Sequence, residues 1–200
     1  MAKLALAKGK KLRLSKSNGS DLKRVEIRLF WTSPAGKSYD VDATALQVRD
    51  SQDKRFPFGR TTGLDEVCFY GQPETTGIVS SGDDQAGGDK EGAPNETLTI
   101  DFSQLRDICT SVPVILTIDK ARKLKQTFSE VTNARVELVD IDNDEVLVTS
   151  DLGDLAAGSI SALFVVFKRE ADGWTFENVA TGFNKDLLEF FELFDIEAEY

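Results

Sequence analysis

Residues 81–96, here called the acidic loop, are best suited to chemistry because they hold five carboxylates and four glycines with almost nothing apolar between them. Glycines let the backbone turn sharply and direct its carbonyl oxygens inward, and clustered carboxylates supply hard oxygen ligands, so together they suit Ca²⁺. Two carboxylates about 5 Å apart repel by about 3 kcal/mol at an effective dielectric of about 20, so several such pairs in one folded loop need a cation. The alternative is a solvated, flexible loop, which many charged, glycine-containing segments are.

A second acidic pair, Asp40 and Asp42, lies within a segment that has the pattern of a strand, residues 39–48. Alternate residues of a strand share a face, so the two carboxylates project from one face about 7 Å apart, while Tyr39 and Val41 take the opposite face. Two unpaired acids would be costly there. If the acidic loop folds over that face, shared cations account for both features.

Other chemistries find little support. The chain has no histidine, which removes the commonest general base near neutral pH, the Ser-His-Asp triad and most zinc or copper ligation. Cys68 and Cys109 form no CxxC motif, and we expect reduced core thiols in a cytosolic protein.

The loop glycines lack the GxxxxGKS or GxxxxGKT pattern of a phosphate cradle. Paired carboxylates can hydrolyse glycosides, but these acids cluster in one loop with no aromatic-lined cleft evident. We therefore expect that the protein is not an enzyme.

The balance of charge limits the partners. Asp and Glu number 34 against 24 Lys and Arg, which gives a net charge of −10. Such a surface repels nucleic-acid phosphates and anionic lipids, so we expect no nucleic acid and no membrane insertion. No stretch approaches the roughly 20 apolar residues of a membrane span. The short apolar patch at the N-terminus precedes Lys8, Lys10 and Lys11, the reverse of a secretory signal, so we expect a soluble, cytoplasmic protein.

Period-2 alternation runs through much of the chain and predicts β-strands. Val25, Ile27 and Leu29 alternate with Glu26 and Arg28, the pattern of a strand with one buried face. Many such runs at short spacing, separated by turn residues, are typical of a sandwich or barrel. Because no linker or repeat divides the chain, we expect one domain over residues 1–200, with an all-β fold: a β-sandwich with a short C-terminal helix. The predicted strands cover residues 24–31, 39–48, 66–70, 77–81, 97–102, 112–119, 134–140, 145–150, 160–168 and 174–180.

Helical signals are sparse outside the C-terminus. Asn184 can cap a helix there, with Asp186 in its first turn, and the apolar side chains that follow fall at helical spacing. We expect this apolar face to pack on the sandwich, the alternative being an interface with a partner. Residues 128–133 are a weaker candidate for a short turn. The apolar face comprises Leu187, Leu188, Phe190, Phe191 and Phe194.

Residues 140–144 (DIDND) resemble the start of an EF-hand calcium loop, with Asp151 at its twelfth position. Glu145 stands where that loop requires Gly, and strand-like residues flank the segment on both sides. We favour a hairpin turn, because Asn-Asp pairs tolerate the backbone geometry of such turns.

Several short motifs resemble, in order and spacing, those of the TerD family of tellurium-resistance proteins. LAKG at residues 6–9 leads into a strand that ends in Ser-Lys, LFW at 29–31 is followed by YDVDA at 39–43, and VCFY stands at 67–70. The acidic loop is similar to the family's G-D-N-x-x-G loop, which closes on a Glu. The resemblance covers nearly the whole chain, continuing through RVELVD at 135–140, Lys168, Arg169, Trp174 and the C-terminal helix.

This resemblance implies a calcium-binding β-sandwich linked to tellurite, phage and oxidative-stress resistance, with no agreed enzymatic reaction. In two places the sequence departs from the family pattern. Asp84 replaces the usual Asn and keeps an oxygen ligand. Lys90, Ala93 and Pro94 replace part of the family's denser Asp/Gly run, which would alter or weaken one of the cation positions. The cation ligands that the resemblance implies are Asp40, Asp42, Asp83, Asp84, Asp89 and Glu96, with Glu91 or a backbone carbonyl near Gly87 as further candidates.

We expect two Ca²⁺ ions close together. The seven carboxylates of this set would leave a large excess of negative charge around one divalent ion. Two ions carry four positive charges, and seven minus four leaves an excess of three, which Lys90 and exposure to water tolerate.

Two functions are consistent with these features. The first is a non-catalytic calcium-binding module that acts with protein partners in a stress-response assembly. The alternative is a structural or interaction protein of a phage or plasmid that uses calcium only for stability. Neighbouring genes distinguish them, because tellurium-resistance genes favour the first and virion genes favour the second.

Overall fold

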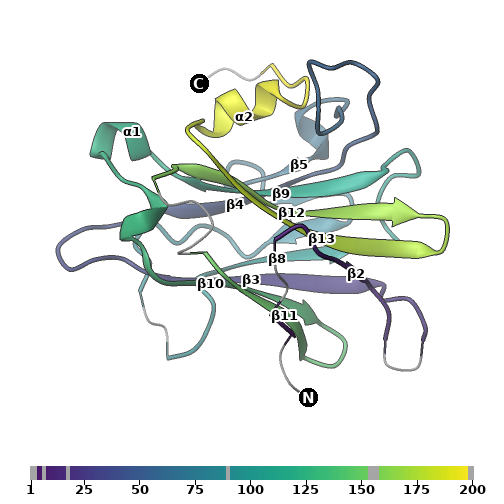
Figure 1. Cartoon of the computed structure of the whole chain (residues 1–200), viewed down its shortest axis with the longest axis horizontal. Coiled ribbons are helices and arrows are strands. Elements are labelled where there is room, and N and C mark those ends of the chain that lie inside the picture. Colours follow the sequence, from purple (N-terminus) through teal and green to yellow (C-terminus); the bar gives the residue numbers. More distant parts are fainter. Residues whose placement is uncertain (1–3, 6–7, 17–18, 89–90, 153–157, 198–200) are drawn as a thin grey trace.

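Two β-sheets face each other across a common core (Figure 1). The structure is a computed structural model that describes residues 4–5, 8–16, 19–88, 91–152 and 158–197. The predicted all-β sandwich with a short C-terminal helix is confirmed. In the described part of the chain, no helix is long and apolar enough to cross a membrane.

Neighbouring strands in both sheets are antiparallel, and among the described strands only β1 and β11 run parallel. The first sheet has the spatial order β1 (Leu4–Ala5), β11 (Glu145–Asp151), β10 (Thr132–Asp140), β3 (Arg24–Thr32), β8 (Glu96–Asp101), β7 (Ile78–Ser80) and β6 (Glu74–Thr75). The second has the order β2 (Lys11–Arg13), β13 (Gly173–Phe183), β12 (Ser161–Glu170), β9 (Ser111–Ile118), β4 (Val41–Leu46) and β5 (Val67–Cys68).

The core lies between the two sheets. In β3, Val25, Ile27 and Leu29 are fully buried, as their alternation predicts, while Glu26 and Arg28 form an ion pair with Nε 2.6 Å from Oε1. By contrast, β9 is buried on both faces. Its sequence is accordingly an almost continuous apolar run rather than an alternating one. The outer face of the second sheet must therefore also be covered.

The helix α2 (Leu187–Glu192) provides this cover (Figure 1). Phe190, Phe191 and Phe194 are buried in one cluster with Leu46 and Ile115, whose side chains leave the outer face of the second sheet. The prediction that the apolar face of the helix packs on the sandwich is confirmed.

The predicted helix cap was wrong by two residues. Asp186, and not Asn184, is the N-cap. The Asp186 carboxylate accepts a hydrogen bond from Glu189 N at 3.0 Å, and the Glu189 carboxylate accepts one from Asp186 N at 2.9 Å. This reciprocal pair satisfies two backbone donors at once, which a single capping bond from Asn184 would not do.

The hairpin predicted at residues 140–144 is confirmed, because β10 and β11 pair antiparallel on either side of it. The Asp140 carboxylate closes the turn by accepting hydrogen bonds from Asp142 N at 3.1 Å and Asn143 Nδ2 at 2.8 Å. Asp142 forms ion pairs with Lys16 at 2.9 Å and Arg24 at 2.5 Å. Side chains of the protein therefore balance the charge of this acidic segment.

The shortest elements differ from the prediction or are missing from it, because two to four residues carry too few alternations to recognise. The strand expected over residues 66–70 is only β5, which follows the 3₁₀-helix η1 (Leu64–Glu66). The 3₁₀-helix η2 (Phe128–Glu130) occupies the predicted short turn. Both cysteines are buried and free, as expected. The strand β2 lies within the strand that the resemblance implies after residues 6–9. The elements that were not predicted are β1, β6 and the short helix α1 (Ala121–Leu124).

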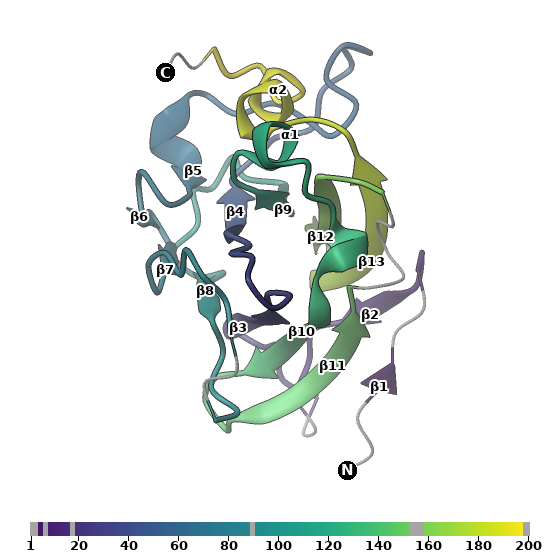
Figure 2. The same cartoon turned by 90° about the vertical axis from the view of Figure 1, so that its left-hand side faces the viewer.

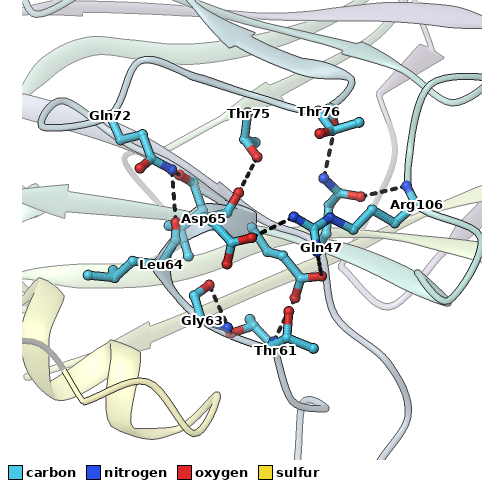
Figure 3. Close-up of polar contacts among 12 residues, drawn as sticks. Gln47, Thr61, Gly63, Leu64, Asp65, Gln72, Thr75, Thr76 and Arg106 are labelled. Carbon is cyan, nitrogen blue, oxygen red and sulfur yellow. Dashed lines mark hydrogen bonds and ion pairs between the residues drawn. The ribbon is translucent and has the colours of Figure 1, made fainter.

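A polar network fastens the segment around η1 to the end of β4 (Figure 3). The buried Gln47 side chain donates from Nε2 to the Thr76 carbonyl at 2.8 Å and accepts from Arg106 N at 2.9 Å. The Arg106 guanidinium pairs with Asp65 at 2.5 Å and with Glu66 at 3.2 Å. These bonds hold η1 and β5 in place, and the chain continues from β5 to Tyr70, which borders the site described next.

Candidate metal centre

The acidic side chains of the site come from both sheets. Asp40 immediately precedes β4 and Asp42 is the second residue of that strand, while Asp83 lies in the loop between β7 and β8. In β4, Val41 and Ala43 belong to the core between the sheets. Because alternate residues point to opposite faces, the Asp42 side chain leaves the outer face of the second sheet. The loop from the first sheet must therefore reach around the sheet edge to meet it.

The structure brings these three carboxylates together. One oxygen each from Asp40, Asp42 and Asp83 lie within 4.8 Å of one another. Asp42 is only 5% exposed, Asp40 is partly buried and Asp83 is exposed. The acidic loop therefore reaches the face of the strand that carries Asp42, which is the arrangement that shared cations require.

A cavity of about 170 Å³ opens beside the three carboxylates. Asp119 also borders it, directly after β9, and its backbone N donates to the Asp40 carbonyl at 2.9 Å. Asp119 pairs with the Lys120 ammonium. This fourth acid was not predicted from the sequence. Asp119 is the last residue of the strand predicted at residues 112–119. Its position beside Asp40 follows only from the antiparallel pairing of β4 with β9.

Burial and repulsion by neighbouring carboxylates disfavour charge on Asp40 and Asp42. Burial is the main cause that raises the pKa of Asp42 to about 8, and the neighbouring Asp40, Asp83 and Asp119 carboxylates raise it further. Burial, followed by the charges of Asp83 and Asp119, raises the pKa of Asp40 to about 6. Lys120 acts in the opposite direction on both groups and does not offset these causes.

Glu96 links the acidic loop to both sheets. It is the first residue of β8 in the first sheet and is only 3% exposed. Its carboxylate accepts one hydrogen bond from Ala43 N in β4 and another from Asp84 N in the loop, each at 3.2 Å. Burial raises the pKa of Glu96 to about 8, although these backbone bonds lower it. Asp42 and Asp83 also raise this pKa, so Glu96 belongs electrostatically to the same cluster.

Asp84 organises the acidic loop itself. Its Oδ1 accepts hydrogen bonds from Ala86 N and Gly87 N, both at 3.2 Å, and its Oδ2 accepts one from Asn95 Nδ2 at 2.9 Å. The Asn95 side chain in turn accepts a hydrogen bond from Trp31 N at 2.9 Å. An Asp side chain that accepts hydrogen bonds from the backbone two and three residues later fixes the conformation of the turn that follows it.

Gly87 allows the loop to approach Trp31 closely. Its φ is +63°, and a Cβ at this position would lie 2.1 Å from Trp31 Nε1. The Trp31 indole N–H donates to the Tyr39 carbonyl at 2.9 Å, one residue before Asp40. Packing of glycine on this indole therefore sets the acidic loop against the chain that enters β4.

The remaining predicted ligands lie farther along the loop. Glu91 is exposed, has a φ of +57°, and does not line the cavity beside the three carboxylates. Asp89 lies outside the described residues. The ligand roles of Asp84, the Gly87 carbonyl, Asp89, Glu91 and Glu96 stay predictions.

The donors at this cluster suit a hard cation. The three side chains that meet offer only carboxylate oxygens, the ligands that Ca²⁺ prefers. Among the described residues, Asp40 Oδ1 is buried without a hydrogen-bond partner. A buried acceptor of this kind is costly unless something pairs with it, and a cation would.

Comparison with known proteins agrees with the resemblance seen in the motifs. The chain is 27% identical over 198 residues to the tellurium resistance protein TerD of Serratia marcescens, covering 98% of both proteins. It is 24% identical to general stress protein 16U of Bacillus subtilis, covering 92% of this chain and 93% of that one. The crystal structure of SCO6318 from Streptomyces coelicolor A3(2), a homologue of TerD, aligns with a TM-score of 0.66 and 26% identity over 84% of this chain and 95% of its own. The model of the TerD domain matches residues 1–194, so the chain belongs to the TerD domain family.

Proposed function

We propose that this chain is a calcium-binding module of a stress response, of the tellurium-resistance type, and that it acts by binding rather than by catalysis. The observation that carries the proposal is the meeting of Asp40, Asp42 and Asp83, with oxygens within 4.8 Å of one another. Two oxygens bound to one Ca²⁺ at about 2.3–2.6 Å can be up to about 5 Å apart, so the cluster has the span of a calcium shell.

Residues 40, 42 and 83 would hold the first ion, and Glu96 would fix the loop that brings Asp83 to it. Ca²⁺ takes about six to eight oxygens, so carbonyls, water or further loop carboxylates complete the shell. The cation would compensate the negative charge that burial and mutual repulsion make costly at Asp42.

The stress-response part of the proposal is supported by family membership. Relatives that align over most of the chain are named for tellurium resistance and for general stress. The non-catalytic part is supported by composition, because the chain has no histidine to serve as a general base. A module of this kind would present a surface organised by its cations to protein partners.

The proposal is tested by melting the metal-stripped protein with and without about 1 mM Ca²⁺, alongside Asp42→Asn and Asp142→Asn. A ligand that binds only the folded state stabilises it, by about 4 kcal/mol at a thousandfold excess over Kd. We expect Ca²⁺ to raise the melting temperature of the wild type and of Asp142→Asn by several degrees. We expect it to raise that of Asp42→Asn far less.

Asp142→Asn is the matched control because it removes the same charge from the hairpin, where Lys16 and Arg24 balance the carboxylate. A wild type whose melting temperature does not change with Ca²⁺ would refute calcium binding. Equal losses in the two variants would refute the location of the site.

A further inference from the structure

A second cavity, of about 420 Å³, adjoins the metal cavity on the outer face of the second sheet. Both cavities are bordered by Asp42, Tyr70, Asp119 and Lys120, so the two spaces are contiguous. The second cavity extends from Asp42 toward α1 and the start of α2. Its volume falls within the range of about 300–1,000 Å³ that is typical of small-molecule sites. We call it the groove.

The walls of the groove differ in chemistry from one end to the other. Three apolar residues border the groove between its ends: Leu187, which is partly buried in the cluster on the outer face, and Ile118 and Ile160, whose side chains belong to the core between the sheets. Lys123 of α1 also borders the groove and forms no ion pair with a described residue. The groove thus has an acidic end at the metal cluster, apolar residues along its length and, at α1, an ammonium group that forms no ion pair within the described part of the chain.

The groove is bordered by elements that are fastened to each other. α1 and α2 lie side by side (Figure 2), and the Arg122 guanidinium joins them. It donates to the Asn184 carbonyl at 2.5 Å and pairs with Glu189 at 2.6 Å and Asp186 at 3.3 Å. A site whose walls are already in place loses little entropy when a ligand binds.

Asp42 faces both cavities. It is only 5% exposed, the described residues donate no hydrogen bond to its carboxylate, and the neighbouring Asp40 Oδ1 is buried without a hydrogen-bond partner. Without a cation, the adjacent carboxylates repel any anion from this end of the groove. With Ca²⁺ bound, the same end offers open coordination positions, because three carboxylates at one oxygen each supply fewer than the roughly six to eight oxygens that the ion takes.

Resting on the proposed function, we infer that the groove binds a small organic anion in a calcium-dependent manner. An anionic oxygen group of the ligand, carboxylate or phosphate, completes the shell of the bound ion. The apolar body of the ligand lies against the partly buried Leu187, and Lys123 adds a second favourable charge. Because the ligand and the ion contact each other, each raises the affinity for the other by the same factor.

The test titrates the full chain with phenylacetate and with phenyl phosphate by calorimetry, once in saturating Ca²⁺ and once in metal-free buffer. Benzyl alcohol, with the ring but no charge, serves as the neutral probe. We expect at least one anion to bind at least tenfold more tightly in Ca²⁺, and benzyl alcohol to show no dependence on Ca²⁺. Binding of phenylacetate alone assigns the site to carboxylates, and binding of phenyl phosphate alone assigns it to phosphates.

Lys123→Glu and Lys125→Glu separate the groove from general charge effects. Both reverse one exposed lysine near α1, but only Lys123 borders the groove. We expect Lys123→Glu to weaken binding of the anion at least fivefold and to leave calcium affinity unchanged, and Lys125→Glu to change neither.

Three results would overturn the inference: no binding of either anion to the calcium-loaded protein, equal binding without calcium, or equal effects of the two lysine variants. If Ca²⁺ itself fails to bind in the same calorimeter, the proposed function fails instead, so the two failures are distinguishable.

Discussion

At the scale of single residues, Asp42 has the most unusual environment of the cluster. It is nearly fully buried in a strand and faces Asp40 and Asp83 across the span of one cation shell. Burying a charge without a partner is expensive, and proteins avoid it by protonation or by binding a counter-ion. The raised pKa of Asp42, about 8, represents the first outcome, and bound Ca²⁺ would represent the second.

The raised pKa values predict how pH affects the metal-free protein. The folded-state pKa is about 6 for Asp40 and about 8 for Asp42 and Glu96, whereas unfolded carboxyls titrate near about 4. A group whose pKa is raised by folding contributes its full stability below the unfolded pKa and loses it as the pH rises through the folded value. This cluster should therefore destabilise the metal-free protein progressively between about pH 4 and about pH 8.

Calcium should reverse that trend, because its ligands must be deprotonated to bind. We expect the difference in melting temperature between calcium-loaded and metal-free protein to increase from about pH 5 to about pH 8. Taking the difference removes the opposite pH dependence of acids whose pKa is lowered by ion pairs, such as Asp142. A difference that is constant or decreases over this interval would contradict the account.

At the scale of elements, the acidic loop is held from three directions. Glu96 bonds it to β4, Asn95 bonds it to β3, and Gly87 packs on the Trp31 indole. Ser38 Oγ adds a bond to the Gln85 carbonyl at 2.7 Å. The loop position that brings Asp83 to Asp42 is therefore built into the fold.

Gly87→Ala is predicted to displace the loop. The new Cβ would meet Trp31 Nε1 at 2.1 Å, and the residue would also keep a left-handed φ. We expect a loss of about 2 kcal/mol in unfolding free energy, together with weaker calcium binding. Chemical denaturation and calorimetric titration of the same preparation would measure both effects.

Gly92→Ala is the matched control in the same loop. Its φ of +87° imposes comparable backbone strain, but nothing lies within 4 Å of the added Cβ. It should cost about 1 kcal/mol and leave calcium affinity close to that of the wild type. If both variants lost calcium binding equally, contact with Trp31 would not be what positions the loop.

The helix α2 is predicted to contribute to the stability of the whole fold by covering the second sheet. Phe191 is buried in the cluster on the outer face and makes an edge contact with Phe69, with ring centroids 5.7 Å apart. Phe191→Ala should reduce the unfolding free energy by about 3–5 kcal/mol. Leu124→Ala, an apolar truncation on the exposed helix α1, should change it by less than about 0.5 kcal/mol. Urea denaturation of both variants would show whether α2 is part of the cooperative core.

The strands with several alternations, such as β3 and β8, could be predicted from the sequence because one buried face imposes period 2. The cap at Asp186 could not be separated from Asn184, since both residue types cap helices. In the site, Asp40, Asp42 and Asp83 could be predicted from local composition and motif. Asp119 could not, because its place beside Asp40 depends on the pairing of β4 with β9, strands separated by many residues in the chain.

At the scale of the whole molecule, the acidic cluster joins the two sheets at one edge. Asp42 lies in the strand β4 of the second sheet and Asp40 immediately precedes that strand, whereas Asp83 lies in a loop of the first sheet. A cation held by all three would add a link between sheets that already meet through their apolar core and through the hydrogen bond from Ala43 N to Glu96. Binding energy that is available only in this arrangement stabilises the folded protein. Calcium binding and the stability of the sandwich are thus expected to change together.

Calorimetric titration of the metal-stripped protein with Ca²⁺ measures directly whether the chain binds calcium. We expect saturable binding with a Kd in the micromolar range or tighter and two ions per chain, the first at Asp40, Asp42 and Asp83. One ion per chain would contradict the two-ion prediction and direct attention to Lys90, Ala93 and Pro94, where the sequence departs from the family pattern. The absence of any saturable binding at millimolar Ca²⁺ would contradict the account as a whole.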